Sequence, residues 1–94
     1  MNIIYLKSSL EDLKWFFYYY ETVFVAGQEK AQKQFYSAES LIESNPYIGH
    51  PRQNEEVREF TIPKMPFSFI YRIQEDRIEI LRVWDERQDR INFE

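Results

Sequence analysis

The sequence predicts an α+β fold in the order β-α-α-β-β-β, with a helical hairpin packed on one face of a small antiparallel sheet. Up to residue 44 the apolar residues recur at the three-and-four spacing of amphipathic helices. From residue 57 onward they alternate with the period of two that is typical of strands. Helices gathered in one half of a chain and strands in the other indicate this class of fold.

Length and composition limit the possibilities further. Ninety-four residues form one domain, residues 1–94, and an aromatic content of 18% supplies much of its core. The chain has no cysteine and one histidine, so we expect no disulfide, no metal site and no cofactor. Without a signal peptide or a long apolar run, the expected location is the cytoplasm, with no membrane contact. The net charge of -4 argues against sequence-independent binding of nucleic acid.

The first half of the chain is predicted to hold one strand and two helices. Residues 2–6 form the strand, and Ser9 with Asp12 has the spacing of a capping box. The first helix is expected over residues 9–24, and the six consecutive aromatics at 15–20 are more than its core face can use. A short break at 25–27 leads to a second helix over residues 27–44, which ends before Pro46. So short a break predicts an antiparallel hairpin.

The second half is predicted to be a meander of three strands. A loop at residues 46–52 precedes a strand at 57–62, which ends at two prolines. The next strands are residues 67–73 and 78–84, joined by a tight polar turn at 74–77. A charged tail follows residue 84.

Several motifs in this order carry a family resemblance. They are the Pro-Tyr-Ile-Gly-His-Pro-Arg segment at 46–52, Val-Arg-Glu-Phe at 57–60, the Tyr-Arg ending of the strand at 67–72, and Ile-Glu-Ile-Leu-Arg-Val-Trp at 78–84 with Arg-Gln-Asp at 87–89. Together they resemble the RelE/ParE toxin superfamily, in particular ParE-like toxins of type II toxin–antitoxin systems, the plasmid stabilisation protein family. The resemblance extends from residue 3 to residue 89. It implies a growth-inhibiting toxin that a cognate antitoxin neutralises in a hetero-oligomeric complex.

The resemblance leaves two mechanisms open. RelE-like members are ribosome-dependent mRNA endonucleases, and metal-free RNA cleavage needs cations and a proton acceptor around the scissile phosphate. Glu59 and Thr61 stand where such members carry lysines, and Ser68 stands where they carry an arginine. Arg87 matches a tail arginine and is a weak catalytic candidate, whereas Phe93 falls near a tail tyrosine but lacks its hydroxyl. The nuclease is therefore the less favoured alternative, beside an inactive member that only binds its antitoxin.

The favoured interpretation is a ParE-like toxin that binds DNA gyrase and requires no catalytic residues. Arg and Trp are common anchors of protein interfaces, so the candidates for target binding are Arg58, Arg82, Trp84 and Arg87. Strand alternation places Arg82 and Trp84 on one face of the sheet. Two alternatives remain: Trp84 is a core ring that caps the end of the sheet, and each arginine is paired with a neighbouring acid.

The surplus aromatics of the first helix suggest a second surface. Tyr18 and Tyr19 are the candidates for antitoxin binding, where an amphipathic helix would bury them. His50 could be a general base, but a loop histidine without a partner is more commonly only solvated. Lys64, between two prolines, is interpreted as a solubilising turn residue.

Overall fold

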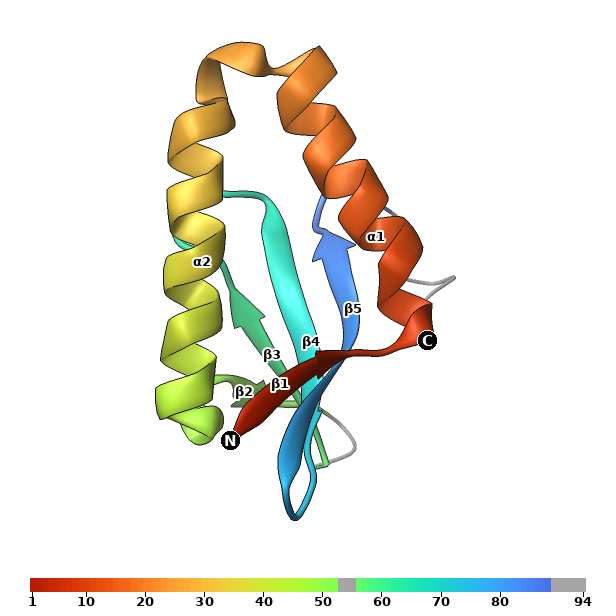
Figure 1. Ribbon diagram of the computed structural model, residues 1–94, viewed down its shortest axis with the longest axis vertical. Coiled ribbons are helices and arrows are strands. Elements are labelled where there is room, and N and C mark those ends of the chain that lie inside the picture. Colours follow the sequence, from red (N-terminus) through yellow and green to blue (C-terminus); the bar gives the residue numbers. More distant parts are fainter. Residues whose placement is uncertain (53–55, 89–94) are drawn as a thin grey trace.

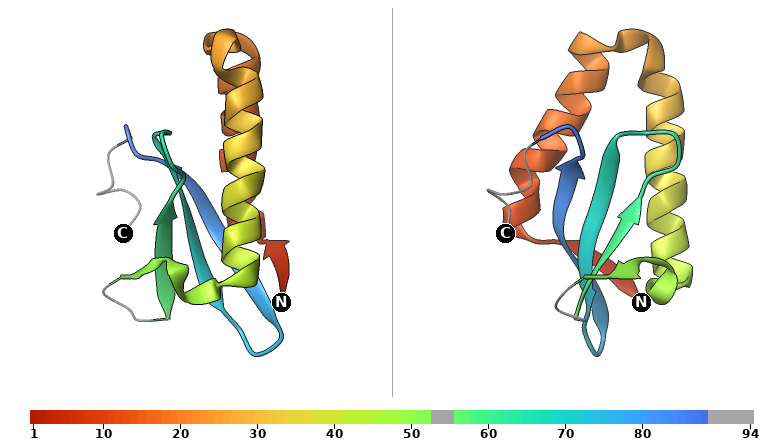
Figure 2. Two further views of the ribbon diagram at one scale, coloured as in Figure 1. Left: turned by 90° about the vertical axis from the view of Figure 1, so that its left-hand side faces the viewer. Right: turned by 180° about the vertical axis from the view of Figure 1, so that it is seen from behind.

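The computed structural model describes residues 1–52 and 56–88, and it confirms the predicted α+β class. Two helices form an antiparallel hairpin that covers one face of a five-stranded sheet (Figures 1 and 2). The helices are α1 (Lys7–Tyr18) and α2 (Gln28–Ser44). The strands are β1 (Asn2–Tyr5), β2 (His50–Pro51), β3 (Val57–Thr61), β4 (Phe67–Ile73) and β5 (Arg77–Asp85).

The sheet has the strand order β1-β5-β4-β3-β2. All its pairs are antiparallel except that of β1 with β5, so the predicted antiparallel sheet needs one correction. β1 joins the edge in parallel, with Ile3 opposite Ile78 and Tyr5 opposite Ile80. This register places side chains of both strands in the same core. Side-chain periodicity does not depend on the direction of the partner strand, so it could not predict the parallel pair.

A β-bulge in β5 decides which of its side chains face the helices. The register with β4 shifts between Ile70 and Tyr71, which leaves Leu81 as the extra residue of β5. Before the bulge the core receives Ile78 and Ile80, and after it the core receives Val83. The bulge thus lets both halves of the strand bury apolar residues on the helix-facing side.

The aromatic run of the first helix divides between the core and the surface. Phe16 is fully buried, and its ring centroid lies 5.0–5.2 Å from those of Phe17, Tyr20, Phe35 and Phe67. Offset and edge-to-face contacts of this kind add to the stabilisation from burial alone. Of the other three aromatics of the run, Trp15 and Tyr19 are half-buried and pack against the edge of the core, whereas Tyr18 is largely exposed.

The ends of the first helix differ from the prediction. α1 begins at Lys7 directly after β1, and its N-terminal residues have no side-chain cap, so the predicted capping box of Ser9 and Asp12 is wrong. The Ser9 hydroxyl donates to the carbonyl of Leu6, and the carboxylate of Asp12 is engaged by β5. After Tyr18 the backbone continues as a π-helix, Tyr19–Val23, and a 3-10 turn, Val25–Gly27, leads into α2.

α1 also covers the edge of β5 that β1 leaves open. The Val83 amide donates to the Asp12 carboxylate at 3.0 Å, and the Ser8 hydroxyl donates to the carbonyl of Leu81 at 2.7 Å. Side chains of the helix therefore satisfy backbone groups that would otherwise offer an edge for strand addition. This contact also fixes the position of α1 beside the end of β5, where the candidate site lies.

No helix within residues 1–52 and 56–88 has the length and apolar character needed to span a bilayer.

Candidate functional site

The end of β5 positions Arg87 through a buried carboxylate. Asp85 is only 5% exposed and accepts bonds from the Nε and Nη2 atoms of Arg87, each at 2.9 Å, and from the Arg87 amide at 3.0 Å. The indole Nε1 of Trp15 donates to the same carboxylate at 2.9 Å. A bidentate, charge-assisted pair of this kind holds a guanidinium in one orientation. Arg87 is thus pre-oriented although its side chain is 43% exposed.

The Asp85–Arg87 pair shifts the pKa values of both groups. Burial by itself raises the pKa of Asp85, but hydrogen bonds from Arg87 and Trp15 outweigh it and hold that pKa below its usual value. The hydrogen bond to Asp85 raises the pKa of the Arg87 guanidinium. Both groups therefore carry their charges at neutral pH, and the carboxylate is available to hold Arg87.

Aromatic side chains from the end of α1 and the start of the π-helix complete this site. Arg87 Nη1 donates to the Tyr19 hydroxyl at 2.8 Å, and the guanidinium lies 4.4 Å from the centroid of the Tyr19 ring. Trp15 stacks on Tyr18 with 5.9 Å between centroids and contacts Tyr19 at 5.8 Å. Tyr18 is 53% exposed. We call this group, Trp15, Tyr18, Tyr19 and Arg87, the aromatic–arginine surface.

Arg82 and Trp84 share one face of the sheet, as strand alternation predicts, and the bulge at Leu81 places them on the face away from the helices. They are opposite Ile70 and Ser68 of β4, and the guanidinium is 4.9 Å from the Trp84 ring centroid. Trp84 is 4% exposed, so the expectation of an exposed tryptophan is wrong and the interpretation as a core ring at the end of the sheet fits. Arg82 is bound in a bidentate pair by Asp12, at 2.6 and 2.9 Å. A role of either residue in target binding stays a prediction.

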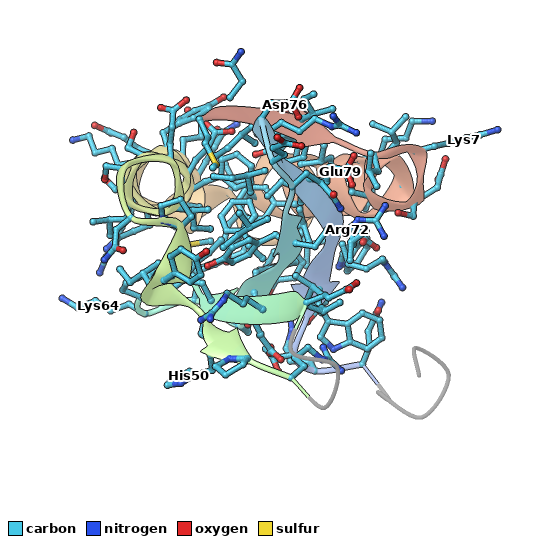
Figure 3. All side chains as sticks on the ribbon, turned by 90° about the horizontal axis from the view of Figure 1, so that it is seen from below. Lys7, His50, Lys64, Arg72, Asp76 and Glu79 are labelled. Carbon is cyan, nitrogen blue, oxygen red and sulfur yellow. The ribbon has the colours of Figure 1, made fainter. Side chains whose placement is uncertain are left out.

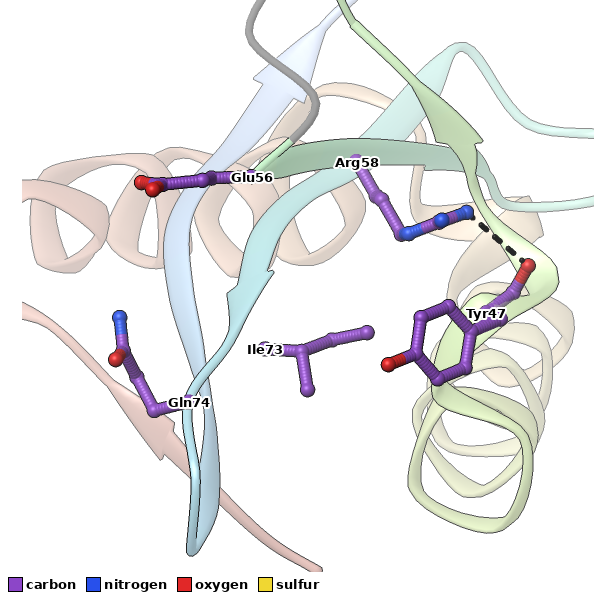
Figure 4. Close-up of a pocket in the computed structure, with 5 residues that line it drawn as sticks. All are labelled: Tyr47, Glu56, Arg58, Ile73 and Gln74. Carbon is purple, nitrogen blue, oxygen red and sulfur yellow. Dashed lines mark hydrogen bonds between the residues drawn. The ribbon is translucent and has the colours of Figure 1, made fainter.

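Arg58 lies apart from the other three candidates. It is opposite Tyr71 on the helix-facing side of β3, two strands away from β5. Its Nη1 donates to the carbonyls of Gly49 at 2.8 Å and Tyr47 at 3.3 Å, and its guanidinium lies 4.8 Å from the Tyr47 ring centroid. A pocket of about 260 Å³ lies between Arg58, Tyr47 and Ile73 (Figure 4). The role of Arg58 in target binding stays a prediction. The observed contacts of Arg58 hold the loop before β2.

The positions that the resemblance assigns to nuclease cations lie together on the face away from the helices. Thr61 is opposite Ser68, with 3.0 Å between their hydroxyl oxygens, and the Ser68 hydroxyl donates to the carboxylate of Glu86. Glu59 is paired with Arg52 at 3.4 Å. At these positions the sheet carries hydroxyls and a carboxylate instead of the cations that RNA cleavage would need, and Ser68 is fully buried.

The arginines of this sheet are largely neutralised, as the alternative interpretation expected. Arg72 binds Glu79 at 2.6 Å, and Figure 3 shows the two side chains adjacent on neighbouring strands. Arg77 also binds Glu79, at 2.9 Å. Arg52, Arg82 and Arg87 have the acidic partners described above. Arg90 and Phe93 lie outside the described residues, and so does Asp89 of the tail motif.

Two residues of the site were missed in the sequence. Trp15 precedes Tyr19 by four residues, the spacing that places two side chains on one side of a helix. Asp85 follows Val83 by two residues, so alternation would have placed its carboxylate on the helix-facing side. These two signals together could have predicted that α1 contacts the end of β5. Of the predicted residues, the structure brings together Tyr19 and Arg87, and separately Arg82 and Trp84.

The fold and the site define a class of protein: a small α+β domain that carries an aromatic–arginine surface. The family model of the ParE toxin of the type II toxin–antitoxin system parDE matches residues 3–90. A solved structure described as the chromosomal ParDE TA system from P. aeruginosa is similar over 88% of this chain and 92% of that chain, with 27% identity and a TM-score of 0.67. No curated relative matches the sequence at a significant level. The chain belongs to the ParE toxin family.

Proposed function

We propose that this ParE-family protein arrests growth by binding DNA gyrase through the aromatic–arginine surface, and that a cognate antitoxin neutralises it. The observation that carries the proposal is the exposed Arg87, held in place by Asp85 beside Tyr19 and Tyr18. Arg, Tyr and Trp are the residues most enriched among the anchors of protein interfaces. An anchor that is already held in its orientation loses little conformational entropy when a partner binds.

The charge distribution supports a protein target over an RNA. Glu59, Thr61 and Ser68 supply no cation, and the nearby arginines are occupied by carboxylates. Phosphate contacts are the main source of nucleic-acid affinity, and a chain with a net charge of -4 provides few of them. The ribosome-dependent endonuclease therefore remains the weaker alternative for this chain.

The contact between Tyr19 and Arg87 suggests how neutralisation would work. Tyr19 is a candidate for antitoxin binding and Arg87 a candidate for target binding, and the two side chains are hydrogen-bonded at 2.8 Å. An antitoxin segment that covers Tyr18 and Tyr19 would therefore cover Arg87 as well. On this proposal the antitoxin neutralises the toxin by occupying the surface that gyrase needs.

Induction of the chain alone in growing cells tests the proposal. We expect growth arrest with relaxed plasmid DNA and intact messages, and we expect Arg87→Ala to relieve the arrest. Arg77→Ala is the matched control, because Arg77 is similarly exposed at the opposite end of β5. Codon-specific cuts in messages with normal supercoiling would instead support the endonuclease. Absence of any growth defect from a folded wild-type chain would contradict both activities.

A further inference from the structure

Arg58 differs from the other arginines of the described chain because no carboxylate neutralises it. Within residues 1–52 and 56–88 every other arginine has an acidic partner at 3.4 Å or less. Arg58 binds two backbone carbonyls instead, and both hydrogen bonds use its Nη1 atom. The donors on its Nε and Nη2 atoms therefore have no acceptor among the described residues. A guanidinium with this part of its fork available is suited to bind a carboxylate from outside the chain.

The loop that holds Arg58 is itself attached to the core. The Gly49 amide donates to the Tyr71 hydroxyl at 3.0 Å, and that hydroxyl donates to the carbonyl of Pro46 at 2.6 Å. A Cβ atom at position 49 would lie 2.6 Å from the same hydroxyl oxygen, so this close approach requires glycine. The carbonyls of Tyr47 and Gly49 are thus fixed through the buried Tyr71. Arg58 is oriented before a ligand arrives, which lowers the entropic cost of binding.

The pocket beside Arg58 has a charged residue on each side and an apolar residue between them. We call it the Arg58 pocket, and its lining is Tyr47, Glu56, Arg58, Ile73 and Gln74. Figure 4 shows Arg58 and Tyr47 on one side, Glu56 and Gln74 on the other, and Ile73 in the middle. The Arg58 pocket therefore offers a cation, an apolar contact and an anion in that order.

The size and charge of the Arg58 pocket limit the ligand. Its volume of about 260 Å³ is below the ~300 Å³ at which sites for drug-sized ligands begin, so a smaller molecule fits. Glu56 repels a second negative charge, which disfavours a dianion such as phosphate. Tyr47 is 68% exposed, so its ring can cover a ligand that enters from solvent. These features select a small molecule with one carboxylate.

We propose that the Arg58 pocket binds a small zwitterion of the amino-acid type. Its carboxylate would accept hydrogen bonds from Nε and Nη2 of Arg58, and its ammonium group would pair with Glu56. Its hydrocarbon part would lie on Ile73, beside the amide of Gln74. The Arg58 pocket shares no residue with the aromatic–arginine surface and lies two strands away from β5. The proposal is therefore independent of the gyrase target.

Three ligands with the same four-carbon chain test the proposal. The zwitterion 4-aminobutyrate carries both charges, butyrate lacks the ammonium group, and butylamine lacks the carboxylate. In the nitrogen-15-labelled full chain we expect saturable shifts of the Gly49, Ile73 and Gln74 amides with 4-aminobutyrate, weakened by added salt. Butyrate should bind roughly threefold more weakly, as expected when one exposed ion pair is lost. Butylamine should give no saturable shift.

Two variants separate ligand binding from the structural role of Arg58. Arg58→Lys keeps the charge but loses the planar fork, so it should weaken binding of 4-aminobutyrate by roughly tenfold. The matched control is Arg77→Lys, which does not line the Arg58 pocket and should bind as the wild type does. Tyr47→Ala removes an exposed ring, so the chain should stay folded by circular dichroism and yet bind more weakly.

Several results would overturn the proposal. One is the absence of saturable shifts in the folded wild-type chain, the result expected if Arg58 only holds its loop. Another is equal binding of the three ligands, or full affinity of a folded Arg58→Lys variant. Tighter binding of inorganic phosphate than of 4-aminobutyrate would also overturn it, because the site would then select anions alone.

Discussion

Replacing Asp85 with asparagine removes the negative charge under Arg87 while keeping the size of the side chain. In the wild type the two carboxylate oxygens accept four hydrogen bonds, three from Arg87 and one from Trp15. The amide of asparagine has one oxygen, and its NH₂ group would face a donor. At least one donor of Arg87 or Trp15 then loses its acceptor at position 85, which is only 5% exposed.

The size of the effect follows from these contacts. Hydrogen bonds to a charged group each contribute about 1.5–3 kcal/mol, but the 43% exposure of Arg87 lets water replace part of the loss. We expect the free energy of unfolding to fall by about 2 kcal/mol. For a domain of this size that corresponds to a decrease in Tm of roughly 10 °C.

The pH dependence gives the prediction its sharpest form. Because the pKa of Asp85 is lower in the folded chain than in the unfolded chain, its contribution to stability is complete above the unfolded value and is lost as the pH falls through the folded value. Urea unfolding should therefore show the full difference between wild type and Asp85→Asn near neutral pH. The difference should begin to shrink below about pH 4, where the carboxyl of the unfolded chain takes up its proton, and should disappear once the pH has fallen through the lowered pKa of Asp85 in the folded chain.

The matched control is Asp76→Asn, at an exposed ion pair with Arg77 in the turn between β4 and β5. Exposed pairs contribute little, so this variant should lose less than about 0.5 kcal/mol. The reasoning would be refuted if Asp85→Asn unfolded at the wild-type urea concentration, or if its deficit stayed constant on acidification.

Three further substitutions test the contacts that hold the fold together. Tyr71→Phe removes the hydroxyl that accepts a hydrogen bond from the Gly49 amide. The variant should lower the free energy of unfolding, measured by urea titration, by about 1–3 kcal/mol. An unchanged free energy of unfolding would contradict this role of the hydroxyl. Asp12→Ala leaves the Val83 amide without an acceptor, so amide exchange at Val83 should accelerate; unchanged exchange would show that water replaces the carboxylate. Phe16→Ala empties the centre of the aromatic core and should cost about 3–5 kcal/mol by thermal unfolding, and a loss below ~1 kcal/mol would mean that the core collapses around the gap.

Periodicity in the sequence predicted the helices and strands because their burial patterns repeat. The strand predicted at residues 67–73 has the observed bounds, and the one predicted at 78–84 falls one residue short at each end. The sequence also predicted that the six aromatics at residues 15–20 are too many for one buried helix face, and part of them are indeed exposed. What repeats along the chain could therefore be predicted.

Features that depend on contacts with distant parts of the chain could not be predicted from the sequence. Asp12 has the right spacing to cap its own helix. Its carboxylate instead accepts hydrogen bonds from the Val83 amide and the Arg82 guanidinium of β5. The burial of Trp84 depends on the strands and side chains around it, which alternation does not reveal. Arg58 and Arg87 look alike in sequence, yet Arg58 lies on β3 and Arg87 lies in the turn after β5, in separate surroundings.

Inhibition of purified DNA gyrase measures the central claim most directly. The account predicts that the wild-type chain blocks supercoiling, and that Arg87→Ala and Tyr19→Ala, each shown to be folded, lose most of this inhibition. Arg77→Ala should inhibit as the wild type does, because Arg77 lies at the far end of β5. Supercoiling that proceeds unchanged with an excess of the folded wild-type chain would contradict the proposed target, and equal inhibition by Arg87→Ala would contradict the proposed surface.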